Sequence, residues 1–435
     1  MVEGSNHSVL NGSYPASRWL DHIVSPYGLA LISYALFLFS CLIPASIYSR
    51  YMMEPDLMFL DLPTILFYTL CVASFLAGVW LLNWLFPVSS GARKFETRIS
   101  SISFLLLPLI LGIAAAVIAD LYLINNFPTL LVSLMAQQGA DVKDTVAFEV
   151  DGHLAFMPLL LIGILWWSFW RSYDFVLQGW RWRLVRSLLV VALLVVIASS
   201  ALVLSRNTLM LALIGLAILY VTRKLGSGQI NSRFIFKNGA VIVVCLSLLF
   251  FLFSYLRGVD SWDEQINTLM GYTAASYNRL AGVVNGRIHY PFAGHGMYLS
   301  GVLAHSQVLP FSRLLEAPEP LDVWSSEFGA VSRAGLDGSL IWSGAFGYIF
   351  SDLGWLSLPF LFVYGLLYGA AWNWIKQGRV IGIVLYPCFG FCALFWVGSN
   401  YLLDQPTEIL SIVVVFLALY ELVFVRSQTL APINR

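Results

Sequence analysis

The residue best placed to do chemistry in this sequence is Arg206, which stands between two long apolar runs. The first run ends near residue 204 and the second begins near residue 208, so almost no loop separates them. A guanidinium fixed at the edge of the hydrocarbon zone costs about 3 kcal/mol on insertion scales unless it finds a partner. A lipid-linked phosphate or diphosphate entering from the bilayer would be such a partner. Snorkelling to lipid headgroups is the alternative.

Histidine is the second residue type that could carry chemistry, because three of the six histidines fall within 17 residues. They are His289, His295 and His305. Imidazole has the unperturbed pKa best suited to general-base work near neutral pH. Spacings of six and ten residues match no metal-ligand pattern, so we expect proton transfer or hydrogen bonding and no metal site. A plain loop or interfacial position is the alternative for each histidine.

Composition indicates that transmembrane helices position these residues. Hydrophobic residues make up 59% of the 435-residue chain and charged residues 11%, against about 25% charged in soluble domains. Runs of about 18 or more apolar residues, long enough to cross a bilayer core, recur along the chain. They predict an all-α, polytopic membrane protein of about ten spans, at 27–49, 64–87, 101–123, 153–170, 187–204, 208–222, 238–256, 354–375, 380–398 and 408–425.

Basic residues predict the orientation of these spans. With the N-terminus inside, 16 of the 24 Lys and Arg residues fall in cytoplasmic segments, which supports N-in and C-in. Seven of the eight remaining basic residues are arginines, which are always charged and bind phosphate or carboxylate through two N–H groups. That bias suits an anionic substrate, although each arginine could simply pair with one of the many carboxylates nearby. The seven are Arg50, Arg206, Arg257, Arg279, Arg287, Arg313 and Arg333.

The spans divide the chain into segments of different character. A cytoplasmic N-terminal segment covers 1–26, and spans one to seven cover 27–256 with a polar outer loop at 124–152. A large outer loop at 257–353 is the only region large enough to build a site. Spans eight to ten cover 354–425, before a cytoplasmic tail at 426–435.

One stretch of the large loop is apolar and rich in glycine. It runs from Asp337 to Trp355 and has glycines at 338, 344, 347 and 354. It is short for a span, and its glycines allow close backbone approach, so we expect a re-entrant or outer-leaflet helix. Ordinary close helix packing is the alternative.

Several catalytic signatures are absent from the sequence. It contains no Walker lysine motif, no His-Glu-x-x-His, no Gly-x-Ser-x-Gly, and no Asp-x-Asp on a cytoplasmic loop. The sequence therefore gives less support to ATP-driven, zinc-peptidase, serine-hydrolase and nucleotide-sugar chemistry. The net charge of zero gives no indication of nucleic acid, and we expect neither a cofactor nor a nucleic-acid partner.

Taken in order, these features resemble the Wzy-type oligosaccharide repeat-unit (O-antigen) polymerases. The likeness extends over about 200–375 and to the overall topology. Its pieces are Ser205-Arg206-Asn-Thr-Leu-Met at the start of a span, Arg279 and Gly294-His-Gly-Met-Tyr-Leu in the late outer loop, Glu327-Phe-Gly, and Gly347-Tyr-Ile-Phe-Ser-Asp-Leu-Gly-Trp before a glycine-rich helix.

The resemblance implies a GT-C-like, metal-independent glycosyltransferase of the bacterial inner membrane, active on the periplasmic face. Donor and acceptor would be oligosaccharide repeats linked to undecaprenyl diphosphate, with a chain-length regulator and a flippase as possible partners. Arginines would hold the diphosphate and stabilise its leaving charge, while a basic group takes the acceptor proton. We nominate Arg206 and Arg279 for the diphosphate, Arg257 and Arg287 as supports, and His295 or His289 as the base.

Two other functions fit the sequence less closely. An O-antigen-type ligase would use the same donor chemistry on a different acceptor, and the sequence hardly separates it from a polymerase. A lipid-linked sugar transporter or flippase would make no bond. Such transporters usually show paired repeats and broken helices near the midplane, and this sequence shows neither clearly.

Overall fold

The computed structural model of the chain is built from helices throughout the part that it describes. The described residues are 23–54, 61–87, 102–136, 138–139, 142, 145, 157–174, 179–226, 232–259, 261–294, 296, 298, 320–398 and 405–429. Within them there is no strand, which confirms the predicted all-α class. The helices are α1 (Pro26–Cys41), α2 (Ala45–Met52), α3 (Leu62–Leu85), α4 (Ser103–Asn126), α5 (Pro128–Met135), α8 (Met157–Ser172), α9 (Trp180–Leu202), α10 (Arg206–Gly226), α11 (Ser232–Tyr255), α12 (Trp262–Met270), the π-helical η4 (Gly271–Ala275), α13 (Ser276–Val284), α16 (Pro320–Arg333), α17 (Gly344–Leu353), the 3-10 turn η5 (Gly354–Leu356), α18 (Ser357–Lys376), α19 (Val380–Leu394) and α20 (Gln405–Thr429).

Six of the described helical segments are long and apolar enough to cross a membrane, as expected for a membrane-embedded protein. A seventh is possible if the bent pair α1 and α2 counts as one span. Each of the ten predicted ranges overlaps a helix, but α8, α11 and the 15-residue α19 are not among these segments, so the count of ten stays a prediction. The six segments are Leu62–Leu85, Ser103–Asn126, Trp180–Leu202, Arg206–Leu225, Gly344–Lys376 and Pro406–Phe424.

The first predicted span, 27–49, is corrected by the structure because it is broken in the middle. Helix α1 ends at Cys41 and α2 begins at Ala45, and their axes meet at 92°. Pro44 lies at the break; proline has no N–H for a helical bond and disfavours helix in the residue before it. Met53 then ends α2 in the left-handed region, with φ of 53°. The chain leaves this turn at Glu54.

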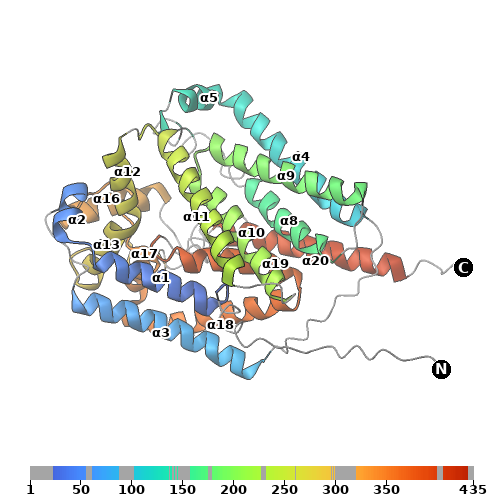
Figure 1. Cartoon of the computed structure of the whole chain (residues 1–435). Coiled ribbons are helices and arrows are strands. Elements are labelled where there is room, and N and C mark those ends of the chain that lie inside the picture. The colour runs from blue at the N-terminus through green and yellow to red at the C-terminus, as the bar shows by residue number, and fades with distance from the viewer. Residues whose placement is uncertain are drawn as a thin grey trace, which may run out of the picture.

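The predicted large loop forms a group of short helices at one end of the bundle. Figure 1 shows α2, α12, α13 and α16 together at the left of the view. Helices α12, η4 and α13 follow one another without a break from Trp262 to Val284. The π-helical turn in the middle belongs to a type that often occurs at functional sites. Helix α17 does not form a separate loop helix but continues through η5 into α18, so the expected re-entrant helix is part of a longer apolar segment.

Helices α3 and α18 approach each other closely through glycine. A Cβ atom added to Gly78 would lie 2.0 Å from the Phe362 carbonyl oxygen, and one added to Gly365 would lie 2.0 Å from the Phe75 carbonyl oxygen. The Ser74 hydroxyl donates a 2.6 Å hydrogen bond to the Leu358 carbonyl across the same contact. Small residues that let backbones meet are the usual basis of helix association in lipid. This contact ties the second span to the helix that follows the large loop.

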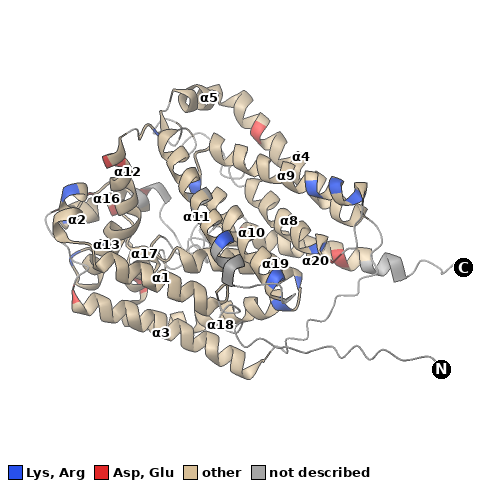
Figure 2. Ribbon diagram, in the orientation of Figure 1, with Lys and Arg blue, Asp and Glu red and all other residues tan. Residues whose placement is uncertain are grey.

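The opposite end of the bundle is held by an ion-pair network. Arg171 of α8 donates to Glu421 of α20 from Nε at 2.7 Å and from Nη2 at 2.9 Å. Asp174 accepts from Arg171 at 3.3 Å and also pairs with Arg223 of α10. Figure 2 shows the first turns of α9 carrying basic residues at this end, while the middle of the bundle is mostly uncharged. The basic residues concerned were assigned to the cytoplasmic side by sequence, and the structure gathers them at one end.

The contact between α3 and α18 generates a stability prediction. Gly365→Ala should push the two backbones apart and lower the free energy of unfolding by about 1–3 kcal/mol, the usual effect of overpacking. Thermal unfolding in detergent would measure the loss. Gly239→Ala in α11 is the control, because a Cβ there meets nothing within 4 Å. It should leave the midpoint unchanged or raise it slightly. Equal midpoints for the two variants would contradict the close contact.

Candidate functional site

Arg279 lies at the centre of a buried polar network beside the π-helical turn. Its side chain is completely buried, and it forms an ion pair with Glu54. All five of its N–H groups donate hydrogen bonds to the protein. Nη1 donates to the Glu54 carboxylate at 3.3 Å and to the Ala275 carbonyl at 3.1 Å. Nη2 donates to the other Glu54 oxygen and, at 2.9 Å, to the Asp337 carbonyl, while Nε donates to the Leu340 carbonyl.

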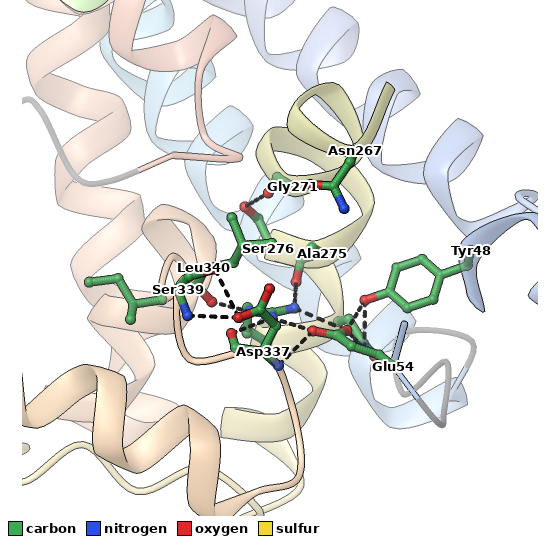
Figure 3. A network of polar contacts seen from close by, with 12 residues as sticks. Tyr48, Glu54, Asn267, Gly271, Ala275, Ser276, Asp337, Ser339 and Leu340 are labelled. Atoms are coloured by element: carbon green, nitrogen blue, oxygen red, sulfur yellow. Dashed lines mark hydrogen bonds and ion pairs between the residues drawn. The ribbon is translucent and has the colours of Figure 1, made fainter. Parts of the chain in front are cut away.

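Glu54 collects contacts from three separate parts of the chain. Besides Arg279, it accepts hydrogen bonds from the Tyr48 hydroxyl, from Asn278 Nδ2 at 3.3 Å and from the Asp337 backbone N–H at 3.0 Å. Figure 3 shows Tyr48, Glu54 and Asp337 converging on this network. The carboxylate therefore joins the turn after α2, helix α13 and the loop before α17. Each of these segments belongs to the end of the bundle that we predict to face away from the cytoplasm.

This geometry changes the role expected for Arg279. An arginine has five N–H donors, and here the protein occupies all of them, so none is left for a phosphate oxygen. The alternative stated for each outer arginine, pairing with a carboxylate, is the arrangement observed. We therefore assign Arg279 a structural role: it fixes α13 and the loop from Asp337 to Leu340.

Arg206 is buried in a different way. It is the first residue of α10 and only 7% exposed. Its Nη2 donates a 3.1 Å hydrogen bond to the Ser254 hydroxyl, and its guanidinium carbon lies 4.8 Å from the centre of the Phe250 ring. Its Nε and Nη1 are buried and have no hydrogen-bond partner among the described residues. Unsatisfied buried donors on a charged group are costly, so the three N–H groups on these two nitrogens are available to an anionic ligand.

A tight turn between α9 and α10 holds Arg206 in place. Leu204 adopts a left-handed conformation with φ of 48°, which costs an L-residue about 1–2 kcal/mol. The Ser205 N–H bonds back to the Ser200 carbonyl at 2.8 Å, and its hydroxyl lies 2.7 Å from that of Thr208. The side chain of Leu204 is 1% exposed and packs in a small apolar cluster with Leu123, Leu130, Val142, Leu202, Leu209 and Phe253. The turn thus places a cation at the positive end of the α10 dipole.

Arg257 is the second cation at this position. It follows the end of α11, and its Nη2 donates a 2.6 Å hydrogen bond to the carbonyl of Leu204. Its Nε is buried without a hydrogen-bond partner in the described part of the chain. The guanidinium groups of Arg206 and Arg257 are close enough to interact electrostatically. Neither forms an ion pair with a carboxylate in the described residues. We call Arg206 and Arg257 the arginine pair.

The other sequence candidates are exposed or lie outside the described residues. Arg287 and His289 are exposed on the segment that follows α13. His295 lies outside the described residues, as do His305 and Arg313. No group of three His, Cys, Asp or Glu side chains among the described residues is arranged to hold a metal ion.

Sequence reasoning missed the two carboxyl groups that matter most here. Glu54 gave no signal because it directly follows an apolar run and precedes other acids. Glu327 of α16 stood in the Glu-Phe-Gly stretch, but nothing in the sequence assigned it a role. It is 6% exposed, and burial raises the pKa of its carboxyl group to about 8. Its carboxyl group lies near the hydroxyls of Tyr290 and Tyr298, with which it interacts electrostatically.

A row of aromatic rings runs from the arginine pair toward Glu327. Beyond Phe250, whose ring faces Arg206, Tyr272 lies 6.5 Å from the Phe250 ring centre. Tyr272 stacks on Trp342 at 4.7 Å. The residue before Trp342, Ile341, accepts a 2.8 Å hydrogen bond from the Tyr290 hydroxyl. Ring contacts therefore lead from Arg206 to Trp342, and a backbone hydrogen bond of the neighbouring Ile341 links them to Tyr290 beside Glu327.

The buried pair predicts a large loss of stability when its carboxylate is neutralised and almost none when an exposed charge is removed. Glu54→Gln should lower the free energy of unfolding by about 3–5 kcal/mol, because it leaves the buried Arg279 charge without a counter-ion. Lys237→Ala, at an exposed position of α11, is the control and should stay within about 0.5 kcal/mol. Thermal unfolding in detergent measures both. A Glu54→Gln protein as stable as the parent would show that the pair does not hold this end together.

The function of this arrangement has to be derived from its own geometry. No family model matches the chain, and no curated protein and no solved structure is significantly similar to it. The likeness to the Wzy-type polymerases therefore stays a prediction that rests on residues of this chain.

Proposed function

We propose that the protein joins oligosaccharide repeat units carried on undecaprenyl diphosphate, and that the arginine pair binds the diphosphate. The observation that carries the proposal is that, in the part of the chain that the structure describes, Nε and Nη1 of the 93% buried Arg206 and Nε of Arg257 have no hydrogen-bond partner. Two cations held side by side repel each other unless an anion lies between them. A diphosphate offers two negative groups and several acceptor oxygens to such a pair.

The position of the arginine pair favours a lipid-linked anion over a soluble one. Arg206 begins a helix long and apolar enough to span a membrane, and Arg257 follows the end of α11. The charges therefore lie at the ends of apolar helices, where the head of a carrier lipid meets the edge of the bilayer. The N-terminus of α10 adds the favourable end of a helix dipole, a common feature of phosphate sites.

The proposed reaction needs only charge stabilisation and one proton acceptor. The acceptor hydroxyl attacks the anomeric carbon, a carbon–oxygen bond forms there, and the bond to the diphosphate oxygen breaks. The electron pair leaves with undecaprenyl diphosphate, whose growing charge the arginine pair stabilises. The acceptor proton passes to a base, for which the exposed His289 and the sequence candidate His295 remain our nominees. Arg279 supports the site from outside by fixing α13 and its neighbouring loop.

Arg206→Ala and Arg257→Ala should each weaken the binding of undecaprenyl diphosphate in detergent. Loss of charge-assisted hydrogen bonds costs about 1.5–3 kcal/mol, which is roughly a 10- to 150-fold rise in Kd. Because Nε and Nη1 of Arg206 have no partner among the described residues, Arg206→Ala should not lower the unfolding temperature, in contrast to Glu54→Gln. Cells that rely on either arginine variant should accumulate lipid-linked single repeats.

The control for this experiment is Lys237→Ala, which should bind and polymerise as the parent does. Wild-type affinity and normal chain lengthening in both arginine variants would overturn the proposal. If the parent instead transfers single repeats to another acceptor, the reaction is that of a ligase. Repeats that cross the membrane without forming bonds would identify a transporter.

A further inference from the structure

Glu327 is a buried acid for which the described residues supply no partner. It lies in α16, outside the segments that could span the membrane, and 94% of it is buried. Among the described residues, none forms an ion pair with it and none donates a hydrogen bond to it. A carboxyl group in this position costs free energy unless something else in the functional state uses it.

Three tyrosine rings form a compact cluster beside Glu327. Tyr290 and Tyr348 stack at 5.6 Å, Tyr298 and Tyr348 at 5.8 Å, and Tyr290 and Tyr298 lie 5.2 Å apart. The Tyr290 hydroxyl is occupied by the Ile341 carbonyl. The Tyr298 hydroxyl is buried near the backbone of Phe292 but makes no hydrogen bond of normal geometry to a described residue. Two neighbouring polar groups, the Glu327 carboxyl and the Tyr298 hydroxyl, therefore have no hydrogen-bond partner in the described part of the chain.

We propose that Glu327 and Tyr298 form a sugar-binding subsite for the glycan of the lipid-linked substrate. The inference rests on the proposed function and deepens it by assigning the part of the site that holds the oligosaccharide. Sugars combine many hydroxyl groups with apolar C–H faces. Paired hydrogen-bonding groups beside aromatic rings fit that combination, whereas a phosphate would require cations.

The aromatic row connects this subsite with the arginine pair. Its rings, Phe250, Tyr272 and Trp342, lead from Arg206 to the segment that bonds Tyr290. A glycan attached to a diphosphate at Arg206 could follow these rings as an extended chain of sugars. The reducing end then lies at the arginine pair and a more distant sugar at Glu327. Bare undecaprenyl diphosphate would reach the first position but not the second.

The charge state of Glu327 follows from its surroundings. The groups that face it or its tyrosine neighbours are the Tyr290 and Tyr298 hydroxyls, with Arg279 near Tyr290 and Asp352 near Tyr298. Burial raises the pKa of Glu327 to about 8, so the carboxyl group is mainly protonated at pH 7. A neutral carboxyl donates one hydrogen bond and accepts another. Above pH 8 it loses the donor, and sugar binding should weaken as pH rises through that value.

Three variants test the subsite. Glu327→Leu removes both hydrogen-bonding functions, Glu327→Gln keeps a neutral donor and acceptor of similar shape, and Tyr298→Phe removes only the unpartnered hydroxyl. Binding is measured on the full-length protein in detergent with two probes. One is bare undecaprenyl diphosphate, and the other is the lipid-linked oligosaccharide extracted from host cells that lack this protein. Thermal unfolding confirms that each variant is folded.

Glu327→Leu should raise the Kd for the sugar-bearing lipid about tenfold or more, and Tyr298→Phe should raise it several-fold. Both should leave the Kd for the bare lipid within about twofold. Glu327→Gln should bind the sugar-bearing lipid like the parent at pH 7 and lose the parent's decline in affinity between pH 7 and pH 9.

Two results would overturn the subsite. One is parental affinity of both Glu327→Leu and Tyr298→Phe for the sugar-bearing lipid, and the other is Glu327→Gln binding as weakly as Glu327→Leu. The failure of the proposed function is a separate result, because it would appear as unchanged binding of bare undecaprenyl diphosphate by Arg206→Ala and Arg257→Ala.

Discussion

The buried ion pair between Arg279 and Glu54 is the interaction on which the rest of this end of the protein depends. The two side chains are almost inaccessible to solvent, so each needs the other to offset the cost of removing a charge from water. The pair also fixes three segments that are far apart in sequence: the turn after α2, helix α13, and the loop that begins at Asp337.

Arginine has two different roles here. The roles differ in how many of the guanidinium N–H groups are bonded to protein oxygens. Arg279 uses every N–H group on protein oxygens and is part of the framework. Arg206 is also buried, but its Nε and Nη1, which carry three N–H groups, have no partner in the described residues. A framework charge is stable without ligand, whereas an unsatisfied charge is poised for an anion. This difference moves the proposed diphosphate site from Arg206 with Arg279 to Arg206 with Arg257.

The proposed site is therefore extended, with its two ends built by different physical means. At the arginine pair, a strained turn at Leu204 and the start of α10 hold cations at the ends of apolar helices. At the other end, α16 buries a neutral carboxyl group beside stacked tyrosines. The aromatic row between them carries no charge. Such a division suits a substrate with an anionic head and a polar, uncharged glycan.

The sequence by itself determined that the protein is helical and embedded in a lipid bilayer. Apolar runs long enough for a bilayer predicted a helical membrane protein, and the absence of other charges around Arg206 identified it as a candidate. Both features could be read from the sequence because they depend on residues that are neighbours in the chain. The break at Pro44 was readable in principle, yet a continuous apolar run concealed the 92° bend. Only the tertiary structure decided which arginines are satisfied. Glu54 and Arg279 are 225 positions apart, and Arg206 approaches Arg257 through the packing of α10 on α11. Contacts of that kind depend on how the helices pack together, which the order of residues does not show.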